Sequence, residues 1–338
     1  MACPVGSQMN PRRSRWLTLT MVVSLCTATC GGGSPIPPSQ PTSDLARAYL
    51  EQLVGFMQPN AINRLTIDWM TFRSRVFAEA STAQTITDTH PAIRVALELL
   101  GDGHSSFRSA TGTVIAVPTR NCRGSGATQP TLPATVGYVK VGAFSGSGSE
   151  ATGFANFIQS NIIAADRDGL IGWIVDVRGN GGGNMWPMVA GVGPVLGEGV
   201  IGHFIDPTGV AINWEYRDGA AWAGGTVQQR VDSPYRLRRE RPRVAVLTDN
   251  GIASSGEATV IAFRGRPDTR SFGEATCGLS TANQGFVMSD GAILALTVAV
   301  MADRTGTPYG DSVPPDEVVT GPGGQVVQRA LAWLQSGN

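Results

Sequence analysis

Two short apolar segments, each followed by a turn and a helical pattern, constrain the fold of this chain most. Residues 170–177 lead into a glycine loop at 179–183 and a helical stretch beyond Met185, and residues 244–248 lead into a turn and a helix that starts near Ser255. Apolar strands without polar alternation are buried on both faces, which is typical of parallel strands joined by helices. The pattern therefore predicts an α/β core of mostly parallel strands.

Helical periodicity precedes this core. Apolar residues recur at helical spacing in three segments, and a strand pattern becomes clear only at residue 136. The core itself is expected to contain a hairpin region, a second hairpin that turns at Ser289–Gly291, and a C-terminal helix at 324–334. The sequence therefore predicts three parts: a helical domain at 43–108, a connecting segment at 109–135 and the α/β core at 136–338. The helices of the first part are expected at 43–57, 68–80 and 87–100, and the first hairpin region of the core at 210–227.

The first thirty residues predict an export signal. Three arginines precede an apolar run at 16–25, which is too short to span a bilayer as a permanent helix. The run leads to Cys30 and three glycines, which is typical of a bacterial lipoprotein cleavage site, although Thr27 stands where such sites have Leu or Val. Residues 31–42 then predict a flexible linker. We expect an exported protein of the periplasm or cell envelope, with either a lipid on Cys30 or an ordinary cleaved signal.

Charge and cysteine content narrow the classes of partner. The chain has 26 basic and 26 acidic residues and no long run of lysine or arginine, so we expect no nucleic-acid partner. Two cysteines lie beyond the signal, Cys122 and Cys277; in an oxidising compartment they permit one disulfide, and two free thiols fit the count equally well. No Cys/His spacing indicates a metal site, and we expect neither metal nor cofactor.

The turn after the second apolar segment carries a candidate nucleophile, Ser254. A serine at a helix N-terminus lies where the helix dipole and the N–H of the next residue, Ser255, stabilise developing negative charge. The same residues form a capping box with Glu257, so this segment alone leaves a helix cap and a nucleophile open. The glycine loop at 179–183 fits backbone oxyanion donors or a tightly packed turn, and it lacks the Gly-Lys-Ser/Thr of a phosphate-binding loop.

A nucleophilic serine needs a base, and the sequence offers four candidates. Lys140, the single lysine, alternates with apolar neighbours inside a predicted strand, while His90 lies in a turn and His203 in an apolar strand. His104 instead follows the glycine turn at 101–103, where the helical domain can present it across a cleft to the core. His104 is therefore the candidate general base.

Five motifs in order make the sequence similar to a known enzyme superfamily. From about residue 43 to the C-terminus, the chain resembles the carboxyl-terminal processing (tail-specific) proteases, and within them the branch of the tricorn protease core and the interphotoreceptor retinoid-binding proteins. The resemblance implies a ClpP/crotonase-like spiral core behind a small helical domain. The motifs are Leu100–Ser105, Val175–Gly183, Ala253–Glu257, Gly273–Gly278 and Val313–Asp316.

The resemblance also implies site residues. The nucleophile falls on Ser254, and the oxyanion donors fall on the N–H of Ser255 and on the loop amides of Gly182 and Gly183. No metal or cofactor belongs to this chemistry.

The base and its orienting group differ from those of the processing proteases. Their catalytic lysine position is Leu279 here, whereas the tricorn-like branch uses the histidine that matches His104. The glutamate that orients the catalytic groups in that branch is replaced by Tyr309–Gly310, so Asp311 is the candidate for that role.

The connecting segment is too short for the PDZ domain that processing proteases carry there, so tail-specific degradation is not expected. The sequence predicts a serine-type peptidase that cleaves peptide or protein substrates through an acyl-enzyme. Two alternatives stay open: a non-catalytic protein that binds hydrophobic ligands or peptides on the same fold, and an esterase.

Overall fold

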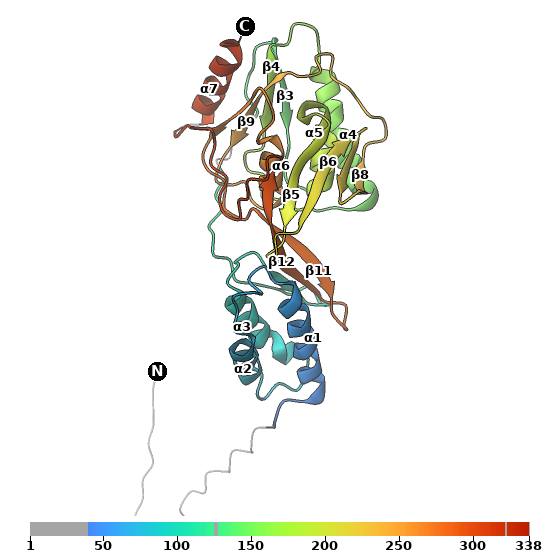
Figure 1. The fold of residues 1–338 in the computed structure, drawn as a ribbon, viewed down its shortest axis with the longest axis vertical. Coiled ribbons are helices and arrows are strands. Elements are labelled where there is room, and N and C mark those ends of the chain that lie inside the picture. The colour runs from blue at the N-terminus through green and yellow to red at the C-terminus, as the bar shows by residue number, and fades with distance from the viewer. Residues whose placement is uncertain (1–39, 125–127, 322, 338) are drawn as a thin grey trace, which may run out of the picture. The chain divides into compact units, whose positions relative to one another are not determined.

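The computed structural model describes residues 40–124, 128–321 and 323–337 (Figure 1). These residues belong to one compact unit that begins at Gln40. The predicted signal peptide, its Cys30 and nearly all of the predicted linker lie outside the described residues.

The three predicted helices near the start of the described chain are present. Ser43 caps the first, because its Oγ accepts from the N–H of Ala46 at 3.1 Å. Asp68 caps the second in the same way. The third ends at Gly101, whose φ of 67° stops the helix and turns the chain toward His104. The elements are α1 (Asp44–Asn60), α2 (Trp69–Glu79), the 3₁₀ turn η1 (Thr87–Thr89) and α3 (His90–Leu100).

A five-stranded parallel sheet forms the centre of the α/β core, in the order β13-β10-β9-β4-β3. Every residue of β4 is buried, which explains the lack of polar alternation in its sequence. Val175 faces the cluster that contains α4, α5 and α6, and Ile174 faces the cluster that contains α7. The strands are β3 (Val136–Lys140), β4 (Gly172–Asp176), β9 (Arg243–Thr248), β10 (Thr269–Gly273) and β13 (Glu317–Val318); the helices are α4 (Gly148–Ala165), α5 (Met185–Leu196), α6 (Ser255–Phe263) and α7 (Gly323–Gln335).

A second, antiparallel sheet of eight strands completes the described fold and is larger than the sequence pattern suggested. The hairpin region predicted at 210–227 forms three strands, and the predicted hairpin at Ser289–Gly291 joins β11 to β12. The predicted α/β class, with buried parallel strands, is confirmed. The strands are β1 (Ser106–Arg108), β2 (Val114–Ala116), β5 (Gly199–Ile205), β6 (Ala211–Arg217), β7 (Ala220–Ala223), β8 (Thr226–Arg230), β11 (Thr281–Val287) and β12 (Ile293–Asp303).

The β11–β12 hairpin extends from the core to the helices α1 to α3 (Figure 1). Leu294 and Leu296 of β12 share one buried cluster with Leu50 and Leu53 of α1. Because His104 lies between α3 and β1, and β1 pairs with β12, this packing holds the histidine motif beside the hairpin.

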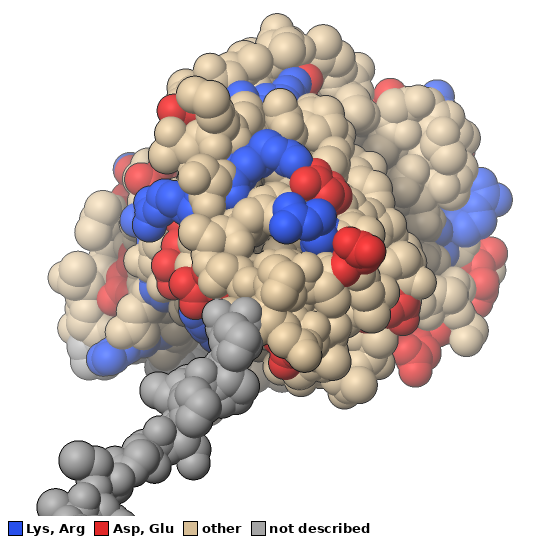
Figure 2. All heavy atoms as spheres, turned by 90° about the horizontal axis from the view of Figure 1, so that it is seen from below, with Lys and Arg blue, Asp and Glu red and all other residues tan. Residues whose placement is uncertain are grey.

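The described part of the segment between β2 and β3 contains no helix or strand, so no PDZ domain is present there. Among the described helices, none is both long and apolar enough to cross a bilayer. On the face drawn in Figure 2, basic and acidic groups are interspersed within broad uncharged areas.

Candidate active site

The two turns predicted to carry the site lie against each other. The glycine loop (179–183) follows β4 and the serine turn (249–254) follows β9; since these strands pair in parallel, both leave the same edge of the sheet. The N–H of Ala253 donates to the carbonyl of Asn180 at 3.0 Å. Strand topology thus brings together two segments that are distant in sequence.

Ser254 has an unusual backbone conformation, with φ of 54° and ψ of −119°. A non-glycine residue with positive φ is strained, and such strain clusters at functional sites. Gly182 is pressed against the same turn: a Cβ at this position would lie 2.8 Å from the carbonyl oxygen of Ala253 and 3.0 Å from Ser254 Cβ. Any side chain at residue 182 would push the serine turn out of place.

The predicted oxyanion donors surround Ser254, but one of them is already engaged. Ser255 is the first residue of α6, where N–H groups have no acceptor within the helix. Its Oγ donates to the carbonyl of Gly183 at 2.6 Å. The N–H of Gly182 donates to Asn180 Oδ1 at 3.0 Å. The amides of Ser255 and Gly183 therefore stay candidates, whereas Gly182 serves close packing in this conformation.

Glu257 connects the serine turn to the loop between β10 and β11. Its carboxylate is fully buried and accepts four hydrogen bonds. Oε2 accepts from the N–H of Ser254 at 2.9 Å and of Leu279 at 2.7 Å; Oε1 accepts from Thr276 Oγ1 at 2.5 Å and from the N–H of Gly278 at 2.9 Å. Burial raises the pKa of Glu257, and these hydrogen bonds oppose that rise. Sequence reasoning recognised this residue only as a helix cap.

The Asp-Gly-His-Ser motif forms a compact turn after α3. Asp102 Oδ1 accepts from the N–H of His104 at 2.8 Å and of Ser105 at 2.6 Å, and Asp102 Oδ2 accepts from Ser105 Oγ at 2.7 Å. Ser105 Oγ also accepts from the N–H of Thr297 in β12, at 2.9 Å. The motif thus fixes the backbone of His104 against the β11–β12 hairpin.

The His104 ring is held by a hydroxyl. Its Nδ1 lies 2.7 Å from Thr281 Oγ1, at the start of β11. Burial lowers the pKa of His104, and the negative charge of Asp102 opposes this shift. The imidazole is therefore predominantly neutral near pH 7, the form that can accept a proton. No sequence signal singled out Thr281, which lies far along the chain from His104.

Asp311 does not contact the histidine. Its Oδ1 forms an ion pair with Arg120 at 3.0 Å and accepts from the N–H of Ser312 at 2.8 Å, and the side chain is 66% exposed. Within the described residues, Asp311 and His104 share no hydrogen bond or ion pair. The prediction that Asp311 orients the base is therefore not supported by this geometry, because Thr281 occupies the position beside Nδ1.

Two of the other candidate bases have partners elsewhere. Lys140 donates to the carbonyl of Arg178 at 2.5 Å and lies 3.3 Å from Asp176. His203 Nδ1 lies 3.0 Å from Asn213 Oδ1 on the neighbouring strand. His104 instead contacts Thr281, which lines the same groove as Ser254.

A groove of about 960 Å³ lies at the serine turn. Ser254 and Ser255 line it together with Gly183 and with Thr281, the residue that holds the His104 ring. The nucleophile candidate and the partner of the base candidate therefore face one cavity. No hydrogen bond joins Ser254 to His104 within the described residues, so proton transfer requires the ring and the hydroxyl to approach further.

The rest of the groove is largely apolar. Arg64, from the loop after α1, reaches across to Asp206 in the β5–β6 turn and forms an ion pair at 2.8 Å. The helical region and the core thus share the walls of the groove. The apolar lining consists of Pro59, Met185, Trp186, Phe204, Val210, Ile212, Ala282, Val298, Ala299 and Met301.

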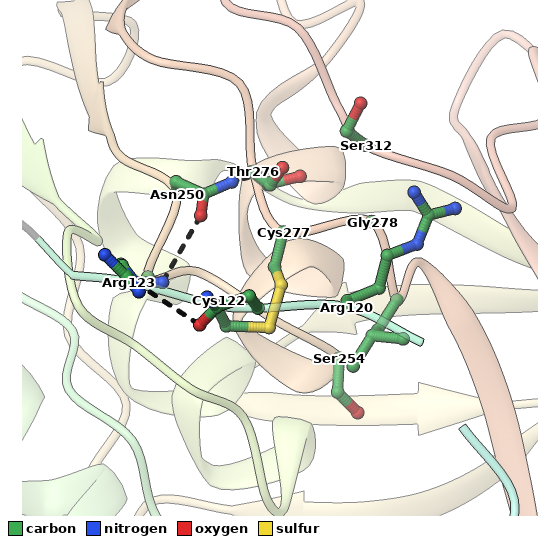
Figure 3. Close-up of a disulfide and its surroundings, with 12 residues drawn as sticks. Arg120, Cys122, Arg123, Asn250, Ser254, Thr276, Cys277, Gly278 and Ser312 are labelled. Atoms are coloured by element: carbon green, nitrogen blue, oxygen red, sulfur yellow. Dashed lines mark hydrogen bonds between the residues drawn. A yellow bond between two sulfur atoms is a disulfide. The ribbon is translucent and has the colours of Figure 1, made fainter. Parts of the chain in front are cut away.

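Cys122 and Cys277 form a disulfide, with Cα atoms 5.1 Å apart (Figure 3). This resolves the choice that the cysteine count left open. The bond fastens the connecting segment next to the serine turn, and Ser254 is labelled beside it in Figure 3. The N–H of Arg123 donates to Asn250 Oδ1 at 3.3 Å, which adds a second attachment.

The described residues contain no cluster of three or more His, Cys, Asp or Glu side chains with the arrangement of a metal site.

Comparisons with known proteins place this geometry in a family. The model of peptidase family S41 matches residues 135–319. The nisin-resistance protein of Lactococcus lactis subsp. lactis is 29% identical over 277 residues, which cover 80% of each chain. A lipoprotein structure from Streptococcus agalactiae superposes with a TM-score of 0.70 at 22% identity, over 87% of this chain and 97% of the other.

The photosystem II D1 C-terminal processing protease is also similar in structure. Its TM-score is 0.55 at 16% identity, over 84% of this chain and 96% of the other. The family match covers more than half of the sequence, and the resemblance to the carboxyl-terminal processing proteases is confirmed. The chain belongs to peptidase family S41, a family of serine peptidases.

Proposed function

We propose that the protein is a serine peptidase in which Ser254 is the nucleophile and His104 is the general base. One observation carries the proposal: Ser254, strained at the N-terminus of α6, faces the same groove as Thr281, whose hydroxyl holds the His104 ring. A helix cap alone would not require that strain or the close approach of Gly182.

The mechanism follows from the hydrogen bonds around the site. With Nδ1–H donating to Thr281, the lone pair of His104 Nε2 accepts the proton of Ser254 Oγ. The alkoxide attacks the carbonyl carbon of the substrate, and the N–H of Ser255 at the helix N-terminus stabilises the oxyanion. His104 then returns the proton to the leaving amine, and water hydrolyses the acyl-enzyme.

The groove favours an extended peptide with apolar side chains. Trp186 and Phe204 supply aromatic surface beside Ser254, and the Arg64–Asp206 pair spans the groove. The nisin-resistance relative suggests nisin as one peptide to test. In the absence of a PDZ domain in the described residues, we expect no preference for protein tails.

We also propose that the protein is exported to the cell envelope, with Cys30 as the site of a lipid anchor. The N-terminal charge and apolar pattern supports export, and one structural neighbour is a lipoprotein. Membrane fractionation of the wild type and the Cys30→Ala variant tests this. A lipid anchor predicts that the variant moves from the membrane to the soluble fraction, and equal distribution would contradict it.

A serine-directed fluorophosphonate probe provides the direct test of the peptidase. The wild type should be labelled and should hydrolyse peptides; Ser254→Ala should lose labelling, and His104→Ala should lose most of it. Ser160→Ala and His203→Ala are matched controls, because Ser160 Oγ donates to the carbonyl of Phe157 within α4 and His203 lies beside Asn213 of β6, away from the serine turn and Thr281. Full activity of both Ser254→Ala and His104→Ala in pure, active preparations would exclude this mechanism.

A carrier on the same fold is the second candidate function. The apolar lining and the lack of a hydrogen bond between Ser254 and His104 in the described structure favour it. A carrier would resist the fluorophosphonate probe and bind an apolar fluorescent ligand, whereas an esterase would be labelled and cleave esters without cleaving peptides.

A further inference from the structure

A second cavity lies at the far end of α5 from the active-site groove. It has a volume of about 610 Å³ and is lined by the C-terminus of α5, the loop after α6 and the end of β12. Met185 at the start of α5 lines the groove, and Leu196 at its end lines this cavity. A helix of this length separates the two sites by about 18 Å.

Arg266 is buried in the wall of this cavity without an acidic partner. Arg266 is only 9% exposed, and it donates its hydrogen bonds to neutral groups. Nε donates to the carbonyl of Leu196 at 3.1 Å, and Nη1 donates to the carbonyl of Pro267 and to Thr269 Oγ1, both at 2.9 Å. No carboxylate of the described residues lies within ion-pairing distance of it. The carbonyl of Leu196 carries the partial negative charge of a helix C-terminus, which compensates only about half of a unit charge.

A second arginine, Arg304, lines the same cavity. Gly265, the residue before Arg266, packs on it so closely that a Cβ there would lie 3.1 Å from Arg304 Cγ. Arg304 Nη2 donates to the carbonyl of Ala262 at 2.7 Å, while its Nε is buried without a partner in the described structure. The carboxylate of Asp303 accepts instead from Thr305, Thr307 and Tyr309.

The two positive charges act on each other. Burial and, to a smaller extent, the charge of Arg304 lower the pKa of Arg266 to about 10, with Asp268 opposing both. Arg266 therefore stays charged at neutral pH. Arg236 on the same cavity wall provides a contrast, because it is exposed and lies near the carboxylates of Glu198 and Asp218.

We propose that this cavity is a binding site for a small phosphorylated anion, held by Arg266 and Arg304. Arg266 and Arg304 line one cavity, and guanidinium groups bind the oxygens of a phosphate group through paired, charge-assisted hydrogen bonds. A dianion would also compensate the buried charge that the protein leaves uncompensated. This site is independent of the proposed peptidase chemistry.

Titration calorimetry on the purified full chain, at constant ionic strength, tests the proposal with two probes. Inorganic phosphate and glycerol phosphate distinguish a site for the free ion from one for a phosphomonoester, and acetate is the control for general anion binding. We expect the wild type to bind at least one phosphate probe saturably. The Arg304→Gln variant should bind that probe at least about tenfold more weakly. Arg329→Gln, on exposed α7 and paired with Glu317, should bind as the wild type does.

Removal of Arg304 also removes its bond to α6, so the variants need a folding check by circular dichroism. If Arg304→Gln unfolds, Arg304→Lys keeps the positive charge and loses the Nε donor, and it should still weaken phosphate binding. Wild-type protein that binds neither phosphate probe, or binds acetate equally well, would overturn the proposal. So would folded Arg304 variants with wild-type phosphate affinity.

Discussion

Replacement of Glu257 by glutamine tests whether one buried carboxylate holds the two halves of the site in register. Glutamine has the same size but offers one acceptor oxygen and an NH₂ group in place of two acceptor oxygens. If its oxygen takes the Oε2 position, the bonds to Ser254 and Leu279 survive. The NH₂ group then faces the N–H of Gly278, while the hydroxyl of Thr276 rotates to accept from it.

This orientation leaves one buried N–H, that of Gly278, without an acceptor. Such a group costs about 1–3 kcal/mol, and the opposite orientation, which leaves two, costs roughly twice as much. We therefore expect Glu257→Gln to lower the free energy of unfolding by about 1–3 kcal/mol. Because Gly278 lies three residues before Thr281, relaxation of this segment also shifts the partner of the His104 ring.

If the same free energy is lost from the stabilisation of the transition state, because the catalytic groups are less well aligned, kcat falls roughly ten- to hundredfold. KM should change little, since Glu257 does not line the groove. Urea denaturation gives the stability change, and peptide turnover with the rate of fluorophosphonate labelling gives the kinetic one. Glu98→Gln, on the exposed face of α3, is the control. Wild-type stability and labelling in Glu257→Gln would refute the reasoning.

Two further predictions concern titration and the disulfide. Because burial lowers the pKa of His104 and the base must be neutral, kcat/KM should rise with pH through an inflection below the ordinary value of roughly 6.5; an inflection above it would contradict the assignment. The disulfide Cys122–Cys277 spans 155 residues, so in the chain-entropy model the double serine variant loses about 5 kcal/mol of stability. Its thermal midpoint should then fall by about 8 °C in calorimetry, and a shift under about 2 °C would show that the connecting segment is held by other contacts.

The sequence predicted the elements whose pattern reflects burial. β4 and β9 are buried almost throughout, and α1 and α3 have one apolar face, so periodicity located them to within a few residues. β10 was not predicted, because its residues Thr269–Gly273 are mostly polar and it becomes a strand only by pairing between β9 and β13. Short strands of this kind are fixed by their neighbours and carry no periodic signal of their own.

The local geometry of the candidate site residues was predictable where one short motif contains both the residue and its constraint. Ser254 and Glu257 lie three residues apart, and the Asp102 carboxylate holds the His104 backbone within a single turn. Thr281 could not be predicted, since it reaches the His104 ring only through the pairing of distant strands. The family resemblance pointed instead to Asp311, near the position of the branch's orienting glutamate, but Asp311 is paired with Arg120.

A neutral partner for the imidazole changes how the base must work. In a serine–histidine–aspartate site, the buried carboxylate stabilises the imidazolium that forms when the serine loses its proton. Thr281 fixes the ring but brings no charge, so this stabilisation has to come from elsewhere. Asp102 supplies it through space, because its negative charge raises the pKa of His104 against the larger effect of burial. In the proposed mechanism, one short motif thus both holds the backbone of His104 and provides a counter-charge, without a carboxylate at Nδ1.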